Sequence, residues 1–304
     1  EYGVDNHISK PEHSSSRISL PRVTLNEDVI FPEDTRLQFE EVQAALRYHK
    51  VIYTDWGFKN VDPTGRSMII NLYGPPGTGK TLAAEAIAGT MGLPYLHIGI
   101  AELESKFVGE TAKNICHSFR LANEEGAILF FDEADTLLGS RLSSVTQGID
   151  NEINAMRSTL LIELERHEGI VIFATNFAKN YDPAFVSRIR YHIEFKLPDL
   201  NARRKLFAKF LVPGIPLQED REHIINTCSE SAANLSGRDI RNVVRIALPK
   251  AFMRNTEKPI VFLEDLFSAI EEIKKGKNNV GARNFVASSE NEIETGRRLL
   301  GITG

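Results

Sequence analysis

One stretch constrains this chain more than any other: residues 74–81, which read GPPGTGKT. It fits the G-x-x-x-x-G-K-[ST] template of a phosphate-binding loop, which lies between a strand and a helix. An apolar run of buried-strand type, 67–73, precedes the loop, and strong helix formers follow it from Leu82. Because both flanks suit the template, we favour phosphate binding over a glycine-rich turn that matches by chance.

Each part of this loop has a chemical role in binding a nucleoside triphosphate. Its glycines let backbone N–H groups turn toward phosphate oxygens, and the following helix adds the positive end of its dipole. Lys80 would neutralise the β- and γ-phosphates, and Thr81 would place its hydroxyl on Mg²⁺. The predicted nucleotide contacts in and after the loop are Gly74, Pro75, Pro76, Gly77, Thr78, Gly79, Lys80, Thr81 and Leu82.

Composition limits the class of protein. A chain of 304 residues with 42% hydrophobic and 25% charged residues is an ordinary globular chain of one large or two modest domains. Its net charge of -5 counts against a general nucleic-acid binder. No apolar run reaches transmembrane length and no signal peptide is visible. We expect Cys116 and Cys228 to be reduced core thiols, which fits a cytoplasmic location.

Apolar runs alternate with helical patterns as far as residue 195. Because the apolar runs are continuous, the sequence predicts an α/β fold, a parallel sheet with helices on both faces. Beyond Pro198 the pattern is mainly helical, which predicts a small lid domain. The chain begins with Glu1 rather than Met, which indicates a fragment or a processed product. The expected parts are a flexible segment (1–24), a large nucleotide-binding domain (25–197), a helical lid (198–275) and a polar extension (276–304).

An acidic pair, Asp132-Glu133, ends the apolar run 127–131. Ligands bind beyond the carboxyl ends of parallel strands, so this pair is expected beside the phosphate loop. Asp132 would hold Mg²⁺ through water, and Glu133 would orient and polarise the water that attacks the γ-phosphate. The alternative is an acidic pair that caps a short helix at 134–138.

Three further polar residues are candidates for the site. Asn176 ends the next apolar run, where its amide could position the attacking water; a turn-forming asparagine is the alternative. Arg188 and Arg190 follow in the segment DPAFVSRIR. An arginine at a subunit edge can stabilise transition-state charge on a neighbour's γ-phosphate, although two surface arginines are more often solvated or paired.

The ordered series GPPGTGKT, FFDEAD, ATN and DPAFVSRIR, followed by a helical region, resembles the AAA+ ATPases over about residues 25–275. The resemblance implies ATP and Mg²⁺ as ligands. It places Asn176 at the sensor-1 position and both arginines in the arginine-finger segment. Where that segment usually reads R-x-G-R, this chain reads Ser187-Arg188-Ile189-Arg190, which leaves open which arginine reaches the neighbour.

Residues 105–111, SKFVGET, resemble the first pore loop of the protein-remodelling AAA branch. The resemblance implies that Lys106, Phe107, Val108 and Gly109 line the channel of a homo-oligomeric, hexameric ring. There Phe107 would grip a translocating protein by apolar contact. The alternative is a core phenylalanine beside a turn.

Two further segments each have two possible interpretations. Ser236-Gly237-Arg238-Asp239 resembles the sensor-2 region, but many members of the branch have alanine where Arg238 stands. Arg238 is therefore a nucleotide contact or a partner of a nearby acid. Val29 and Ile30 are candidates to cover the adenine base, and core packing is the alternative.

These features together predict ATP hydrolysis coupled to remodelling, unfolding or disassembly of protein substrates, with no nucleic-acid partner. One alternative is a nucleic-acid-directed AAA+ loader, which the acidic balance disfavours. Another is a nucleotide-gated scaffold or switch, which the intact Asp132-Glu133 pair disfavours. His167-Glu168 lacks the second histidine of an HExxH zinc site, so the sequence predicts no attached zinc protease.

Overall fold

The computed structural model describes residues 18–62, 67–99, 110–139, 147–176 and 181–280. The chain divides into two compact units, one ending at Pro198 and one beginning at Asp199. Each unit has a hydrophobic core of its own. Within the described ranges, no helix has both the length and the apolar character that crossing a membrane requires.

The first unit is built on a six-stranded sheet in the order β1-β3-β4-β5-β2-β6. Its strands are β1 (Ile18–Ser19), β2 (Met68–Tyr73), β3 (Tyr95–Gly99), β4 (Ile128–Asp132), β5 (Ile170–Thr175) and β6 (Tyr191–Glu194). All neighbouring strands are parallel except β1, which pairs antiparallel with β3. The predicted parallel sheet is confirmed, with one short antiparallel strand added at its edge.

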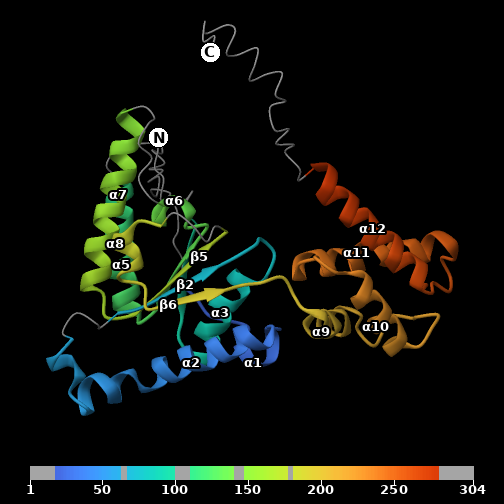
Figure 1. Cartoon of the computed structure of the whole chain (residues 1–304), viewed down its shortest axis with the longest axis horizontal. Helices are drawn as coiled ribbons and strands as arrows, with labels where there is room; N and C mark the ends of the chain where they lie inside the picture. Colours follow the sequence, from blue (N-terminus) through green and yellow to red (C-terminus); the bar gives the residue numbers. More distant parts are fainter. Residues whose placement is uncertain (1–17, 63–66, 100–109, 140–146, 177–180, 281–304) are drawn as a thin grey trace, which may run out of the picture. The chain divides into compact units, whose positions relative to one another are not determined.

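Helices cover both faces of this sheet. They are α1 (Leu25–Asp28), α2 (Glu33–Lys50), α3 (Lys80–Met91), α5 (Glu110–Glu125), α6 (Asp135–Leu138), α7 (Gln147–Arg166) and α8 (Pro183–Val186). Figure 1 shows α5 and α7 on one side of the sheet and α1, α2 and α3 on the other. Along β4, Leu129 and Phe131 join the core on the first side, whereas Ile128 and Phe130 join the core on the second. This burial on both faces explains why the strands read as continuous apolar runs.

Residues 18–24 correct the prediction of a flexible segment over 1–24. Ile18 and Ser19 pair with Leu96 and Tyr95, and the Arg22 amide donates to the Glu85 carboxylate at 3.0 Å. A Cβ added at Gly89 would lie 2.0 Å from the Val23 carbonyl oxygen, so this backbone lies directly on α3. A two-residue edge strand has no period of its own, which is why the sequence did not reveal it.

Two other expectations from the sequence are resolved. Val29 packs against the core beneath α2 and α3, which supports the core-packing alternative. Cys228 is buried and free, as predicted, but Cys116 is exposed and free on α5, so its prediction as a core thiol was wrong.

The second unit is a helical bundle. Its helices are α9 (Leu200–Phe210), α10 (Arg221–Ser231), α11 (Gly237–Arg254) and α12 (Leu263–Val280). Asp199, Asp220 and Ser236 cap the first three helices through their side chains. A single bridge joins Leu217 to Val261.

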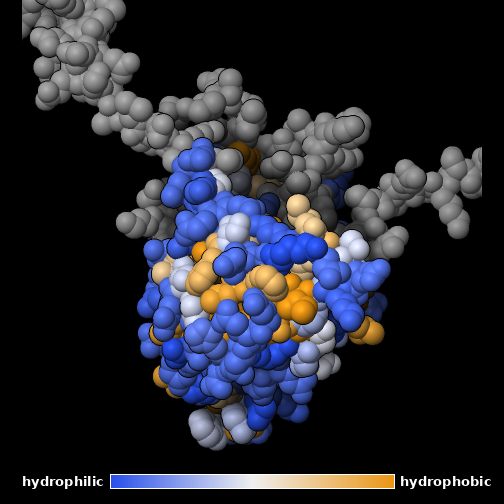
Figure 2. Space-filling view, turned by 90° about the vertical axis from the view of Figure 1, so that its right-hand side faces the viewer, coloured by the Kyte–Doolittle hydropathy of each residue, from blue (hydrophilic) through white to orange (hydrophobic). Residues whose placement is uncertain are grey.

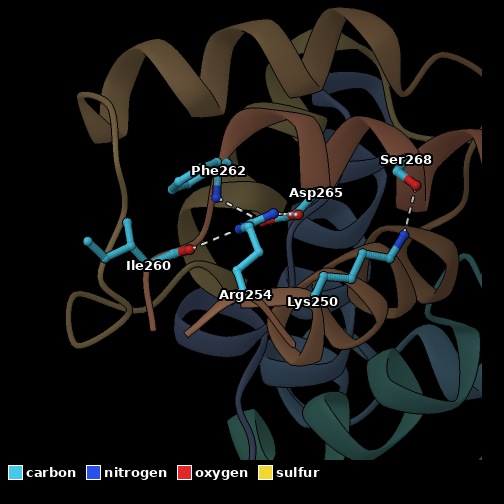
Figure 3. A network of polar contacts seen from close by, with 6 residues as sticks. All are labelled: Lys250, Arg254, Ile260, Phe262, Asp265 and Ser268. Carbon is cyan, nitrogen blue, oxygen red and sulfur yellow. Dashed lines mark hydrogen bonds and ion pairs between the residues drawn. The ribbon is translucent and has the colours of Figure 1, made fainter. Parts of the chain in front are cut away.

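An ion pair joins the two longest helices of this unit (Figure 3). Arg254 of α11 donates to the carboxylate of Asp265 at the start of α12, and its guanidinium lies 4.0 Å from the Phe262 ring centroid. Asp265 is 4% exposed and also accepts from the Phe262 amide. The Arg254 hydrogen bonds outweigh burial and hold the pKa of Asp265 below its usual range. The carboxylate therefore stays charged and fastens α12 to α11.

The helical unit also exposes apolar side chains. Figure 2 shows a largely hydrophilic face with a group of apolar residues near its centre. The large exposed apolar residues of this unit are Val212, Phe252, Met253 and Ile260, and Met253 is 85% exposed. Apolar groups of this kind often mark contacts with other proteins.

His167 is expected to make the first unit sensitive to acid. It is 2% exposed, packs edge-on against Phe119, and has no hydrogen-bond partner for either ring nitrogen among the described residues. Burial lowers the pKa of His167 from 6.5 to about 4, although Glu168 opposes this shift. Between these values the unfolded chain binds a proton that the folded chain does not. Stability is therefore lost as the pH falls, by about 2 kcal/mol between pH 7 and 5.

Replacing His167 with leucine removes this proton-linked loss. Urea unfolding at pH 7 and pH 5 should show a pH-dependent loss about 2 kcal/mol smaller in His167→Leu than in the unmodified chain. His117→Leu, which replaces an exposed histidine of α5, is the matched control. An unchanged slope in His167→Leu would contradict the assignment.

Candidate nucleotide site

The phosphate loop lies between β2 and α3, beyond the carboxyl end of β2. Gly74 has a φ of 139°, and a Cβ there would lie 2.2 Å from the Phe195 carbonyl oxygen. Gly79 precedes α3 with a φ of 104°. Both positions therefore require glycine, one for close backbone approach and one for its left-handed conformation. The loop is held in shape from within by Thr78, whose hydroxyl donates to the Pro75 carbonyl at 2.8 Å.

Lys80 closes this loop from inside. Its side chain is buried, and its ammonium donates to the carbonyls of Gly74 at 2.8 Å and Pro75 at 2.9 Å. A third hydrogen bond, 3.0 Å long, reaches Oδ1 of Asn176 at the end of β5. The loop that follows β2 and the asparagine that follows β5 thus meet at the ammonium of Lys80.

Thr81 and Asp132 meet beside Lys80. The Thr81 hydroxyl donates to Oδ2 of Asp132 at 2.9 Å, although 51 residues separate the two. Hydroxyl and carboxylate oxygens are the ligands that Mg²⁺ takes, so the pair fits the predicted metal site. Burial alone would raise the pKa of Asp132, but hydrogen bonds from His97, Thr81 and the Glu133 amide hold it below its usual range. Asp132 is therefore an anion at neutral pH.

His97 was not among the predicted site residues. It lies on β3, with its ring stacked on Phe130 and its Nε2 3.4 Å from Oδ2 of Asp132. A polar residue in the middle of an apolar strand was the available signal. Its partner is set by the register between β3 and β4, which the sequence does not reveal.

Glu133 is exposed beside Asp132 in an unusual backbone conformation. Its φ is 55°, and its amide donates to Oδ1 of Asp132 at 2.9 Å. A non-glycine residue in this region costs about 1–3 kcal/mol and is often found at functional sites. The capping alternative is not supported, because α6 begins after Ala134 without a side-chain cap.

The other predicted nucleotide-site residues lie on the loop, at the start of α3 and at the end of β5. Thr81 and Leu82 are exposed in the first turn of α3, and Pro75 and Pro76 are exposed on the loop. The backbone N–H of Asn176 donates to Oδ1 of Asp135 at 2.9 Å, which ties the end of β5 to α6.

Arg188 and Arg190 lie at the opposite end of the sheet. The Arg190 amide donates to the carbonyl of Ile69 near the start of β2, whereas the phosphate loop follows the end of β2. The five steps along the strand from Ile69 to Gly74 span about 16 Å at roughly 3.3 Å each, which is longer than an arginine side chain. Arg188 pairs with Glu165 of α7, and Arg190 donates to the Tyr53 hydroxyl at 2.8 Å.

The remaining candidates lie in the helical unit or outside the described ranges. Arg238 is exposed in the first turn of α11, and it makes no ion pair among the residues described. The neighbouring acid, Asp239, instead bonds Ser236 and Lys277. Lys106, Phe107, Val108 and Gly109 fall in the undescribed range just before α5.

A strand, a glycine loop and a helix, with Lys80, Thr81 and Asp132 gathered at one end of a parallel sheet, define a P-loop nucleotide-binding unit. Residues 70–197 match the model of the ATPase family associated with various cellular activities (AAA). Residues 70–197 are therefore an AAA domain, whose phosphate loop fits a nucleotide.

Several curated proteins resemble the chain. The proteasome-activating nucleotidase of Saccharolobus islandicus (strain Y.N.15.51 / Yellowstone #2) is 31% identical over 270 residues, which cover 86% of this chain and 65% of that protein. The 26S proteasome regulatory subunit 7 homolog of Saccharomyces cerevisiae is 32% identical over 214 residues, or 68% and 44% of the two chains. The proteasome-associated ATPase of Streptomyces griseus is 38% identical over 175 residues, or 50% and 29%. The chain thus spans 65% or less of the length of each of these relatives.

Proposed function

We propose that this chain hydrolyses ATP in the presence of Mg²⁺ at a site shared between neighbouring copies in a ring, expected to be a hexamer. Hydrolysis drives the remodelling, unfolding or disassembly of protein substrates drawn through the pore of that ring. The main support for this proposal is that the loop residues and the two arginines lie at opposite ends of one sheet.

The loop residues bind the triphosphate. Lys80 exchanges its contacts with the Gly74 and Pro75 carbonyls for phosphate oxygens, and the amides at the start of α3 add further donors. Thr81 and Asp132 hold Mg²⁺, the latter through water, and the bound ion offsets charge on the phosphates. Asp132 suits this role because its neighbours favour the charged form of its carboxylate.

Two residues act on the attacking water. Glu133 accepts a proton from it or polarises it, and the exposed position of Glu133 beside Asp132 leaves its carboxylate open to solvent. The Asn176 side chain is already oriented by Lys80, so its amide can orient the same water as the phosphates bind.

The arginines act on a different copy. Arg190 joins the sheet about 16 Å from the loop of its own chain, so its charge serves the nucleotide of a neighbour. Such an arginine stabilises the charge that develops on the transferred phosphoryl group. The site is therefore incomplete in a single copy.

Protein substrates are favoured for two reasons. The names of the three relatives described above connect those proteins with the proteasome. The segment SKFVGET carries an aromatic residue, Phe107, that can grip many sequences because apolar contact needs no particular partner. The nucleotide role of Arg238 and the cytoplasmic location remain predictions of the sequence.

Replacing Phe107 with alanine tests the threading step. We expect unfolding of a tagged fluorescent protein to fall about tenfold, because an aromatic anchor of this kind dominates a contact. The basal ATPase rate should change by less than about twofold, since Phe107 is outside the predicted nucleotide site. Leu37→Ala, which removes an exposed apolar side chain of α2, is the control. Unfolding that continues at the unmodified rate in Phe107→Ala would rule out the pore-loop assignment.

A further inference from the structure

An aromatic cluster surrounds the side chain of Arg190. The Tyr53 ring is stacked on His49 at 4.4 Å between centroids and meets the edge of Phe58 at 5.3 Å. The Arg190 guanidinium lies 5.5 Å from the Tyr53 ring centroid and donates to the Tyr53 hydroxyl at 2.8 Å. The same hydroxyl donates to Oδ2 of Asp62 at 2.9 Å. Tyr53 therefore holds Arg190 by its ring and by its hydroxyl.

A change of helix type carries Tyr53. Helix α2 ends at Lys50, and the chain continues as a π-helix, η1 (Val51–Asp55), closed by a hydrogen bond from the Trp56 amide to the Val51 carbonyl. Short π-helical turns are rare and are often found at functional sites. Tyr53 of this turn lies 137 residues from Arg190 in the sequence. Its side chain nevertheless contacts that arginine and is only 8% exposed.

The two arginines are held by different kinds of partner. Arg188 pairs with the carboxylate of Glu165 and donates to the Ala184 carbonyl at 2.6 Å, so its charge is offset within its own subunit. Tyr53 is neutral, because burial and its hydrogen bond to Asp62 raise its pKa. Its contact orients the guanidinium of Arg190.

We propose that Tyr53 is a positioning residue for Arg190, which it holds ready for the nucleotide of a neighbouring copy. This inference rests on the proposed function. An arginine side chain loses substantial rotamer freedom when it is fixed, and a partner that fixes it beforehand removes that cost from the transition state. Arg188, which pairs with Glu165, anchors the segment to α7.

A mixing experiment tests the proposal in trans. Carrier subunits with Glu133→Gln bind ATP without turnover and still present Arg190 to wild-type neighbours. A fixed ratio of carrier to wild type is chosen at which the mixture keeps measurable turnover, and the rate is expressed per wild-type subunit. Four carriers are compared: Glu133→Gln alone, and the same carrier with Tyr53→Phe, Arg190→Ala or Tyr48→Phe added. Tyr48 is an exposed tyrosine of α2 and serves as the matched control.

We expect the Tyr53→Phe carrier to lower the rate of its wild-type neighbours about tenfold, because one hydrogen bond to a charged group is lost. The Arg190→Ala carrier should lower it at least as much, and the Tyr48→Phe carrier should match the plain carrier. If the Arg190→Ala carrier has no effect, Arg190 is not the trans-acting arginine of the proposed function. If Arg190→Ala lowers the rate and Tyr53→Phe does not, only the inference about Tyr53 fails.

Unmixed rings separate positioning from a general structural role. Tyr53→Phe should lower kcat about tenfold with little change in thermal unfolding, and it should have no further effect in the Arg190→Ala background. An equal loss in both backgrounds would mean that Tyr53 acts through the fold rather than through Arg190, and would overturn the proposal.

Discussion

Substituting Glu133 with glutamine is expected to lower the ATPase rate at least a hundredfold and to leave ATP binding nearly unchanged. A residue that accepts or directs a proton in the transition state typically contributes about 10²–10⁴ in rate. Glutamine keeps the size of the side chain. The strained backbone at φ 55° and the hydrogen bond from the backbone N–H of residue 133 to Asp132 should therefore persist. The measurement is phosphate release at saturating ATP, beside a titration with labelled nucleotide.

Glu124→Gln provides the control for Glu133→Gln, because it removes an exposed carboxylate near the end of α5. That variant should hydrolyse ATP at the unmodified rate. Turnover of Glu133→Gln within a few fold of the unmodified chain would remove Glu133 from its assigned role. It would also revive the reading of this chain as a nucleotide-gated switch.

Substituting Lys80 with methionine is expected to weaken ATP binding about a hundredfold or more. Hydrogen bonds that involve a charged group contribute roughly 1.5–3 kcal/mol each, and the ammonium is expected to make two of them to phosphates. Methionine keeps an unbranched stem in the buried space that Lys80 fills. A fluorescence titration with labelled nucleotide measures the effect.

Two controls keep the Lys80 result interpretable. Thermal unfolding without nucleotide shows whether the chain still folds once the Gly74 and Pro75 carbonyls have lost their donor. Lys196→Met, on an exposed lysine just after β6, should bind ATP as tightly as the unmodified chain. A folded Lys80→Met chain with unchanged affinity would contradict the assignment of the loop.

The features that the sequence predicted well are those encoded within a short stretch. The phosphate loop needs glycines, a lysine and a threonine at fixed spacing, and buried parallel strands read as apolar runs. The fold class and the AAA family are confirmed for that reason. The roles of the individual site residues remain predictions, supported by the convergence of Lys80, Thr81, Asp132 and Asn176.

Cys116 was mispredicted although its neighbours contained the answer. Ile115, Phe119 and Ala122 recur at helical spacing and form the buried face of α5. Cys116 lies about 100° around the helix from Ile115, which turns it toward solvent. Its residue type suggested burial, but the period of the helix was the better guide.

Contacts between distant segments could not be predicted. The pairing of His97 with Asp132 depends on the register of β3 against β4, and that of Tyr53 with Arg190 depends on a π-helical turn. Neither leaves a local pattern, because each is fixed by where the strands and helices pack. The edge strand β1 depends in the same way on β3.

The ATPase rate per subunit, measured against protein concentration, tests the shared site most directly. It is repeated with a variant carrying both Arg188→Ala and Arg190→Ala added to the unmodified chain. We predict that the rate per subunit rises with concentration as rings form, and that the added variant lowers the rate of the unmodified subunits. A rate that is independent of concentration and of the added variant would place hydrolysis within a single copy and contradict the account.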